Sequence, residues 1–325
     1  MPSRLQDLPR FTLLDGPSPL QPMARLSAAL GGRADLWIKR EDLLPLAFGG
    51  NKLRNLEFHI GAALAEGADT LVTSGRRWSN HCRLTAAAGA KAGLAVHLVL
   101  SGPPVDPPGP NQRLDELLGA RVHVTPTAER AEREARVSAV VDELRGQGRR
   151  PYVVPVGGSG VEGAFGQVLA GLELAGQAAD RGLAVNAVVV PSATGGTQAG
   201  LMIGLEVAGL EARVLGVAVA HPPDEVRPSI AALLGSLGEL AGCRVDASEI
   251  ELDGSQLGDG YGRTTPAADE ATRLLARTEG ILVDPIYTAK ALAALIRDVR
   301  EGMFDGRTVV FWHAGGTPGL FERLD

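Results

Sequence analysis

The stretch AVVVPSATGGTQAGLMIGLEV, residues 187–207, joins a short β-branched run to a helix-like segment through two adjacent glycines. A strand, a glycine turn and a longer helical pattern in this order are typical of one unit of a parallel α/β sheet. The same order recurs along the chain, where short apolar runs alternate with helix-like segments. The predicted strands are 36–38, 71–73, 96–100, 122–124, 152–156, 187–190, 214–219 and 308–311. We therefore predict an α/β protein with open twisted parallel sheets and flanking helices.

Composition limits the classes of function. The chain has 325 residues, 45% of them hydrophobic, which suits two domains. A net charge of -6 without a basic run argues against a nucleic acid partner, and no apolar stretch is long enough to span a bilayer. The Met1 to Arg4 start lacks the apolar core of a signal peptide, so we expect a soluble, cytoplasmic protein. Only Cys82 and Cys243 are present, which predicts free thiols and no metal site.

Sites in parallel sheets form where strands end and helices begin, so the glycine-rich joins are the places to search. One join, Gly49-Gly50-Asn51-Lys52, is followed at once by an amphipathic pattern that places Lys52 in a first helical turn. The positive end of the helix dipole would lower the pKa of Lys52, and a neutral amine is what reacts with an aldehyde. Taken alone, Lys52 fits a solvated surface lysine equally well.

A second join carries two hydroxyls around two glycines, at Thr194-Gly195-Gly196-Thr197. Backbone amides of such a loop, at the start of a helix, form a cradle for phosphate. The loop lacks the Gly-Lys-Ser/Thr ending of a nucleotide P-loop, so a monophosphate suits it better than a triphosphate. The glycines of 158–163 resemble a dinucleotide motif, but no acidic residue follows at the expected spacing, and a structural turn explains them better.

Three further joins carry polar or aromatic side chains. Ser79-Asn80-His81 opens an Ala-rich helix, where Ser or Asn serves as a cap by default, and His81 fits either a satisfied buried histidine or a functional one. Tyr287 begins the helix before the last strand, and Tyr261 precedes it; each is either a half-buried ring or a proton donor. The last join, Trp312 to Gly319, follows the strand 308–311.

Together these segments resemble the family of D-cysteine desulfhydrase and 1-aminocyclopropane-1-carboxylate deaminase, which are tryptophan-synthase-β-like pyridoxal phosphate enzymes of fold type II. The resemblance runs from about Leu8 to Phe321. Its most specific pieces, in chain order, are IKREDL from Ile38, GGNK ending at Lys52, SNH from Ser79, TGGT from Thr194, RTEG from Arg277 and DPIY from Asp284.

The resemblance implies pyridoxal 5'-phosphate as cofactor, held by Lys52 as a Schiff base. It also implies that Asn80 contacts the cofactor's phenolic oxygen, that the loop Ala193, Thr194, Gly195, Gly196 and Thr197 binds its phosphate, and that Thr288 lies at the cofactor. Ser79 would face the substrate carboxylate, with Tyr261 and Tyr287 acting near the substrate and His81, Trp78 and Arg77 contacting it.

The implied architecture is a split large domain, 1–53 and 158–325, enclosing a small domain, 54–157, in a homodimer. The implied reaction removes the α-proton of a small amino acid and eliminates its β-substituent, giving a keto acid and ammonia. Alternatives are a 1-aminocyclopropane-1-carboxylate deaminase, a β-replacement synthase and a catalytically silent binding protein.

Two features separate this chain from its relatives. The deaminases carry Glu after the tyrosine and Leu between His and Gly-Gly, where this chain has Thr288 and Ala314; the threonine favours the desulfhydrase branch, and the alanine fits neither. Arg76-Arg77-Trp78 stands where relatives have Gly, an aliphatic residue and Gln. Two cations and an indole beside the substrate suggest an anionic or larger side chain rather than D-cysteine.

Overall fold

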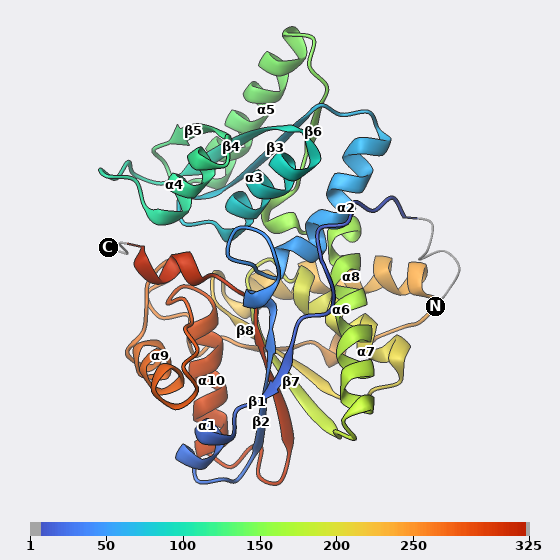
Figure 1. The fold of residues 1–325 in the computed structure, drawn as a ribbon, viewed down its shortest axis with the longest axis vertical. Coiled ribbons are helices and arrows are strands. Elements are labelled where there is room, and N and C mark those ends of the chain that lie inside the picture. Colours follow the sequence, from blue (N-terminus) through green and yellow to red (C-terminus); the bar gives the residue numbers. More distant parts are fainter. Residues whose placement is uncertain (1–7, 323–325) are drawn as a thin grey trace.

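The computed structural model describes residues 8–322, and its strands form two separate sheets (Figure 1). The Met1 to Arg4 start lies outside these residues. The larger sheet has the order β1-β2-β10-β7-β8-β9, and the smaller one the order β5-β4-β3-β6. All pairings are parallel except the antiparallel pairing of β1 with β2. The predicted fold class, open parallel sheets with flanking helices, is confirmed.

The strands are β1 (Leu20–Pro22), β2 (Asp35–Arg40), β3 (Thr70–Arg76), β4 (Ala95–Ser101), β5 (Arg121–Thr125), β6 (Pro151–Val153), β7 (Val185–Ser192), β8 (Arg213–Ala218), β9 (Glu251–Asp253) and β10 (Thr308–His313). The helices are α1 (Ala24–Ala29), α2 (Lys52–Ala65), α3 (Asn80–Ala92), α4 (Pro110–Leu117), α5 (Arg130–Gly146), α6 (Val161–Asp180), α7 (Gly196–Ala208), α8 (Pro223–Ala241), α9 (Pro266–Glu279) and α10 (Thr288–Arg300). Short 3₁₀ turns are Glu41–Leu43, Val156–Gly158, Ala247–Glu249 and Thr317–Phe321.

The larger sheet is covered on both faces. α1, α9 and α10 bury one face, while α6, α7 and α8 bury the other. Its central strand β7 is apolar throughout Ala187 to Val190, as a strand buried on both faces requires.

The smaller sheet lies at the top of Figure 1, with α5 against one face. α2 and α3 contribute Leu53, Leu56 and Leu84 to the core on its other face. Leu13 and Leu44, from before α2, belong to that same core, so the predicted domain limits at 53/54 and 157/158 stay a prediction.

Three differences from the predicted strands have local causes. The run predicted at 152–156 ends as β6 at Val153, because Pro155 has no N–H for the sheet and a 3₁₀ turn starts at Val156. β1 and β9 were not predicted. Each lies at an edge of the sheet and has only three residues. A strand this short cannot show the alternation of apolar and polar residues by which strands are predicted.

Candidate active site

A cavity of about 850 Å³ lies where the strands of both sheets end. Its wall includes the carboxyl ends of β3, β6 and β7 and the residues directly after β10, Ala314 and Gly315. Crevices at the carboxyl ends of parallel strands are the usual binding sites of such sheets. Most of the residues predicted to be functional line this cavity: Lys52, Ser79, Asn80, His81, Ala193, Thr194, Gly195, Thr197, Tyr261, Tyr287 and Thr288.

Lys52 is the first residue of α2, as predicted, and it lines the cavity. It is one of four lysines in the chain, and the other three are placed elsewhere. Lys39 is buried in an ion pair with Glu173, Lys290 donates to backbone carbonyls, and Lys91 is exposed on α3. Lys52 is therefore the single lysine available to a ligand in the cavity.

Burial lowers the pKa of Lys52 from its usual value to about 8. The direction agrees with the prediction. Removal of the ammonium from water by burial is the cause that accounts for it here. An amine with this pKa has a substantial neutral fraction near neutral pH, which a nucleophilic lysine needs.

The glycines before Lys52 are required by close packing. A Cβ on Gly315 would lie 2.6 Å from the Cα of Gly50, and Gly50 itself has φ +131°. The amide of Asn51 donates to the carbonyl of Ala314 at 3.0 Å. The two glycine-rich joins thus pack backbone on backbone, which fixes the start of α2 against the end of β10.

The loop of Thr194 to Thr197 lies at the N-terminus of α7. A Cβ on Gly195 would lie 2.5 Å from Cγ1 of Ile230, and one on Gly196 would lie 2.7 Å from Oγ of Ser159. Gly196 does not line the cavity by itself, but it supplies the first turn of the helix. The first amides of a helix have no partner within it and favour an anion, so this cradle fits a phosphate group.

Asn51, which belongs to the predicted join before Lys52 but was given no role of its own, is hydrogen-bonded to this loop. Its Nδ2 donates to Oγ1 of Thr197 at 2.9 Å, and its carbonyl accepts from Nε2 of Gln167 at 2.9 Å. The only signal for it was its position beside Lys52.

Ser79 and Asn80 begin α3. Ser79 caps the helix, its Oγ accepting from the amide of Cys82 at 3.2 Å, so its own hydroxyl proton is left for a ligand. Asn80 Oδ1 accepts from Nη1 of Arg83 at 2.7 Å, which leaves the Nδ2 amide hydrogens as the donors on the cavity side. The capping role and a ligand role are therefore compatible.

Only one of the two ring nitrogens of His81 is hydrogen-bonded within the described residues. Its Nε2 lies 2.8 Å from Oγ1 of Thr73, which donates its one proton to the carbonyl of Val154 at 2.8 Å. Nε2 must therefore carry the proton and donate. Nδ1 is buried and has no hydrogen-bond partner within residues 8–322. Burial, and next the charge of Lys52, hold the pKa of His81 well below its usual value, so it is neutral.

Tyr261 and Tyr287 meet at their hydroxyls, which are hydrogen-bonded to each other. Burial raises the pKa of Tyr261 and raises that of Tyr287 well above its ordinary value, so both are protonated. One hydroxyl donates to the other, which leaves one proton of the pair free for a ligand. Lys290 donates to the carbonyl of Leu257 at 2.8 Å and so ties the loop of Tyr261 to α10.

Asp284 organises the start of α10. Its carboxylate accepts from the amides of Tyr287 at 2.9 Å and Thr288 at 3.0 Å. The Thr288 hydroxyl donates to the same carboxylate at 2.6 Å. Its proton is therefore committed to Asp284. The Thr288 oxygen also accepts from the amide of Asp284 at 2.9 Å, so Asp284 fixes this side chain by two hydrogen bonds.

Arg77 and Trp78, predicted as substrate contacts, do not line the cavity. Arg77 is buried with its guanidinium carbon 6.0 Å from the centre of the Trp78 ring. Trp78 packs edge-to-face on Tyr261 at 5.8 Å between ring centres. Trp78 therefore packs behind Tyr261 and Arg77 lies next to Trp78, so Trp78 supports the cavity wall without lining it. Arg76 faces the cavity in their place.

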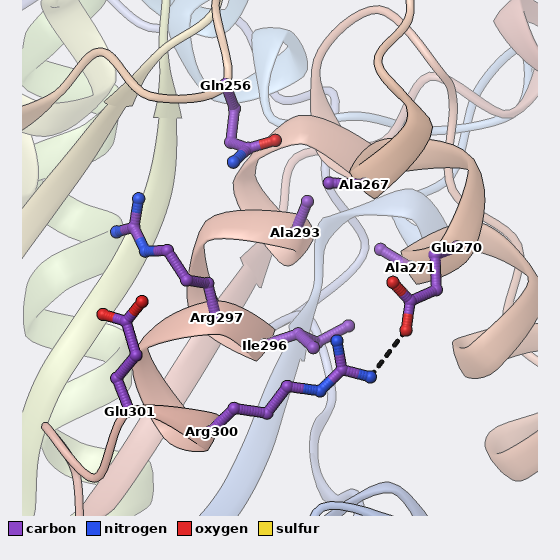
Figure 2. Close-up of a pocket in the computed structure, with 9 residues that line it drawn as sticks. All are labelled: Gln256, Ala267, Glu270, Ala271, Ala293, Ile296, Arg297, Arg300 and Glu301. Carbon is purple, nitrogen blue, oxygen red and sulfur yellow. Dashed lines mark hydrogen bonds and ion pairs between the residues drawn. The ribbon is translucent and has the colours of Figure 1, made fainter.

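A second hollow, of about 310 Å³, lies between α9 and α10 (Figure 2). Arg300 reaches across it to Glu270 at 2.6 Å, and Arg297 is paired with Asp253 and Asp298. Its charges satisfy one another and none of the predicted site residues lines it, so it is not the candidate site.

Two kinds of feature are absent from residues 8–322. They contain no helix long and apolar enough to cross a membrane. Nor do they hold a group of three or more His, Cys, Asp or Glu side chains arranged around a metal position.

Open parallel sheets, a half-buried lysine at a helix start and a glycine-rich anion cradle in the same cavity together define the class of fold type II pyridoxal phosphate enzymes. The family model described as "Pyridoxal-phosphate dependent enzyme" matches residues 11–315. The chain belongs to this family.

Individual relatives agree with this assignment. D-cysteine desulfhydrase of Salmonella newport (strain SL254) is 39% identical over 98% of this chain and 97% of its own length. The enzyme of the same name from Yersinia pestis (strain Pestoides F) is 41% identical over the same shares. A solved ACC deaminase homologue has a TM-score of 0.90 and 34% identity, covering 98% of this chain and 95% of its own. A solved threonine deaminase from T.th., with a TM-score of 0.67, 24% identity and 92% of each chain covered, shares the fold.

Proposed function

We propose that this protein is a pyridoxal phosphate-dependent lyase that removes the α-proton of a small amino acid and eliminates its β-substituent, as a D-cysteine desulfhydrase does. The observation that carries the proposal is Lys52, the one lysine in the cavity, half-buried and with its pKa lowered to about 8. When bound, the cofactor would supply the electron sink for the carbanion at Cα.

The residues around Lys52 fit that cofactor. The amides of Gly195, Gly196 and Thr197 would hold its phosphate, and the Asn80 amide would donate to its phenolic oxygen. Thr288 would lie at its ring nitrogen, with its hydroxyl held by Asp284. Without a carboxylate there to keep that nitrogen protonated, the ring would be a weaker electron sink, which suits fast β-elimination better than opening of a cyclopropane.

Two groups would move protons. The Lys52 amine, once displaced by the substrate amine, would take the α-proton, since its pKa of about 8 is low enough for a base at neutral pH. The pair Tyr261 and Tyr287, with one free hydroxyl proton, would protonate the leaving group or orient it. Ser79 would donate to the substrate carboxylate, and His81 Nδ1 would accept from the substrate.

A substrate screen tests this function. D- and L-amino acids with β-leaving groups and 1-aminocyclopropane-1-carboxylate are incubated with the holoenzyme, and keto acid and ammonia are measured. We expect equal amounts of both from β-substituted amino acids, none from the cyclopropane, and none from Lys52→Ala. Turnover of the cyclopropane would assign the deaminase function. A need for an added nucleophile would assign β-replacement, and a cofactor-loaded protein without turnover would be a binding protein.

The proposal extends to the assembly and the domains. A homodimer, a cytoplasmic location and domain limits of 1–53 with 158–325 and 54–157 are part of it. Two separate sheets with their own cores support the division. Light scattering of the purified holoenzyme measures its molecular mass in solution. The mass of a monomer would contradict the proposed homodimer.

A further inference from the structure

Two arginines from distant parts of the sequence line the same cavity. Arg76 ends β3, and Arg133 lies in the first turn of α5. The guanidinium carbon of Arg76 lies 5.9 Å from the centre of the Tyr261 ring. Both side chains thus share one cavity wall, and burial, and next the positive charge of Arg76, lower the pKa of Arg133.

Among the described residues, neither arginine is held in an ion pair. Glu134 also lines the cavity and acts on Arg133, but its carboxylate is paired with Arg130 at 2.7 Å. Within residues 8–322, no carboxylate lies within 4.0 Å of either guanidinium, and the Arg76 side chain makes no hydrogen bond. Arg133 has a buried Nε without a partner and one long contact, 3.5 Å from Nη1 to Ser101 Oγ. By contrast, Arg54, Arg213 and Arg297 are each paired with carboxylates. Two guanidiniums that line one cavity without an ion-pair partner cost free energy that a bound anion would offset.

The arginines are separate from the other anion positions of the cavity. The phosphate cradle is on α7, and the substrate carboxylate is assigned to Ser79 at the start of α3. Arg76 stacks instead on Tyr261, whose hydroxyl is bonded to that of Tyr287. The tyrosine pair is the proposed proton donor to the leaving group, so the arginines flank the position of the substrate's β-substituent.

We propose that Arg76 and Arg133 form a subsite for an anionic group at the end of the substrate's side chain. The substrate would be an α-amino acid whose β-substituent carries a carboxylate, sulfonate or phosphate. This inference rests on the proposed lyase function and names its substrate class. In the reaction, the Cα–H and Cβ–X bonds break, and X departs with the electron pair of the Cβ–X bond and gains a proton. With one water consumed, the products are a keto acid, ammonia and HX.

The test compares anionic and neutral substrates of the holoenzyme. O-phosphoserine, S-carboxymethylcysteine and cysteate are set against cysteine, S-methylcysteine and β-chloroalanine, each as D and L forms. We expect a higher kcat/KM for at least one anionic compound than for every neutral one. A charge-assisted hydrogen bond contributes roughly 10- to 150-fold in affinity, so Arg76→Gln and Arg133→Gln should each lower kcat/KM for the anionic compound by about that factor.

The neutral substrates and a third variant separate specificity from general damage. Arg76→Gln and Arg133→Gln should each lower kcat/KM far more for the anionic compound than for the neutral ones. Arg136→Gln removes the same charge from the same helix at an exposed position that does not line the cavity, and it should leave both substrate classes unchanged. A neutral compound preferred by the wild type, or an equal loss for both classes in the two variants, would overturn the subsite.

A binding measurement keeps this inference distinct from the lyase proposal. Succinate and its neutral counterpart butyramide are titrated calorimetrically into the wild type and the Arg133→Gln variant. If succinate binds more tightly than butyramide to the wild type and this difference is lost in the variant, the anion subsite is supported. If no compound turns over in the assays, only the lyase function is refuted. Equal affinity in both proteins refutes the subsite.

Discussion

At the scale of single residues, burial of Lys52 in the cavity lowers the pKa of its amine and so makes the amine reactive. Its pKa of about 8 is the result of removal from water. Below pH 8 the protonated, unreactive amine therefore dominates, and above it the neutral amine does. Competitive acetylation of cofactor-free protein, followed by mass spectrometry, measures this titration. Reactivity of Lys52 should level off just above pH 8, whereas an ordinary solvated lysine has a pKa of about 10.4.

The exposed Lys91 serves as the internal reference in the same sample. If the two amines follow the same curve, the cavity does not activate Lys52.

The tyrosine pair makes a second residue-scale prediction. Tyr287→Phe removes one of the two bonded hydroxyls, and with it the free proton of the pair. Loss of a general acid costs about 10²- to 10⁴-fold in rate, so kcat should fall by that factor while cofactor loading, measured by absorbance, is kept.

Tyr152 is the third tyrosine and does not line the cavity, so Tyr152→Phe is the matched control and should keep its rate. Equal effects in both variants would show that the pair has no catalytic role.

At the scale of elements, Asp284 positions the start of α10. It accepts from the amides of Tyr287 and Thr288 and from the Thr288 hydroxyl. Asp284→Ala leaves these buried donors unpaired, at about 1–3 kcal/mol for each unsatisfied group. Thermal unfolding should show lower stability and assays lower turnover, because Tyr287 loses its anchor.

Asp246→Ala gives the comparison. Asp246 caps an exposed 3₁₀ turn away from the cavity, so its loss should cost about 0.5–2 kcal/mol and leave turnover intact. Unchanged turnover in Asp284→Ala would contradict the positioning role.

Site residues that belong to a clear strand–turn–helix pattern could be predicted from the sequence, and those on other elements could not. Lys52 and the loop of Thr194 to Thr197 were predictable, because each directly follows a strand or glycine join whose local pattern is clear. Arg133 was not. It lies on a surface helix rich in charge, where one arginine resembles the next, and only the folded chain brings it to Arg76. Arg77 and Trp78 were misplaced, because the sequence does not give the direction in which a turn points its side chains.

At the scale of the whole molecule, a buried ionic network ties the start of α2 to β2 and α6. Arg54 donates to Glu41 and Glu173, and Glu173 also pairs with Lys39. Glu41→Gln should destabilise the protein by about 3–5 kcal/mol in urea unfolding, because Arg54 keeps a buried charge without its full partner.

The exposed pair of Glu270 and Arg300 provides the contrast, since Glu270→Gln should change stability by at most about 1 kcal/mol. Similar small losses in both variants would mean that the network does not stabilise the fold.

The central claim is that Lys52 alone holds the cofactor, and borohydride reduction tests it most directly. Reduction fixes pyridoxal phosphate to whichever lysine holds it, and peptide mapping by mass spectrometry identifies that residue among the four in the chain. We expect one adduct, on Lys52. An adduct on Lys39, Lys91 or Lys290, or none in a protein saturated with cofactor, would contradict it.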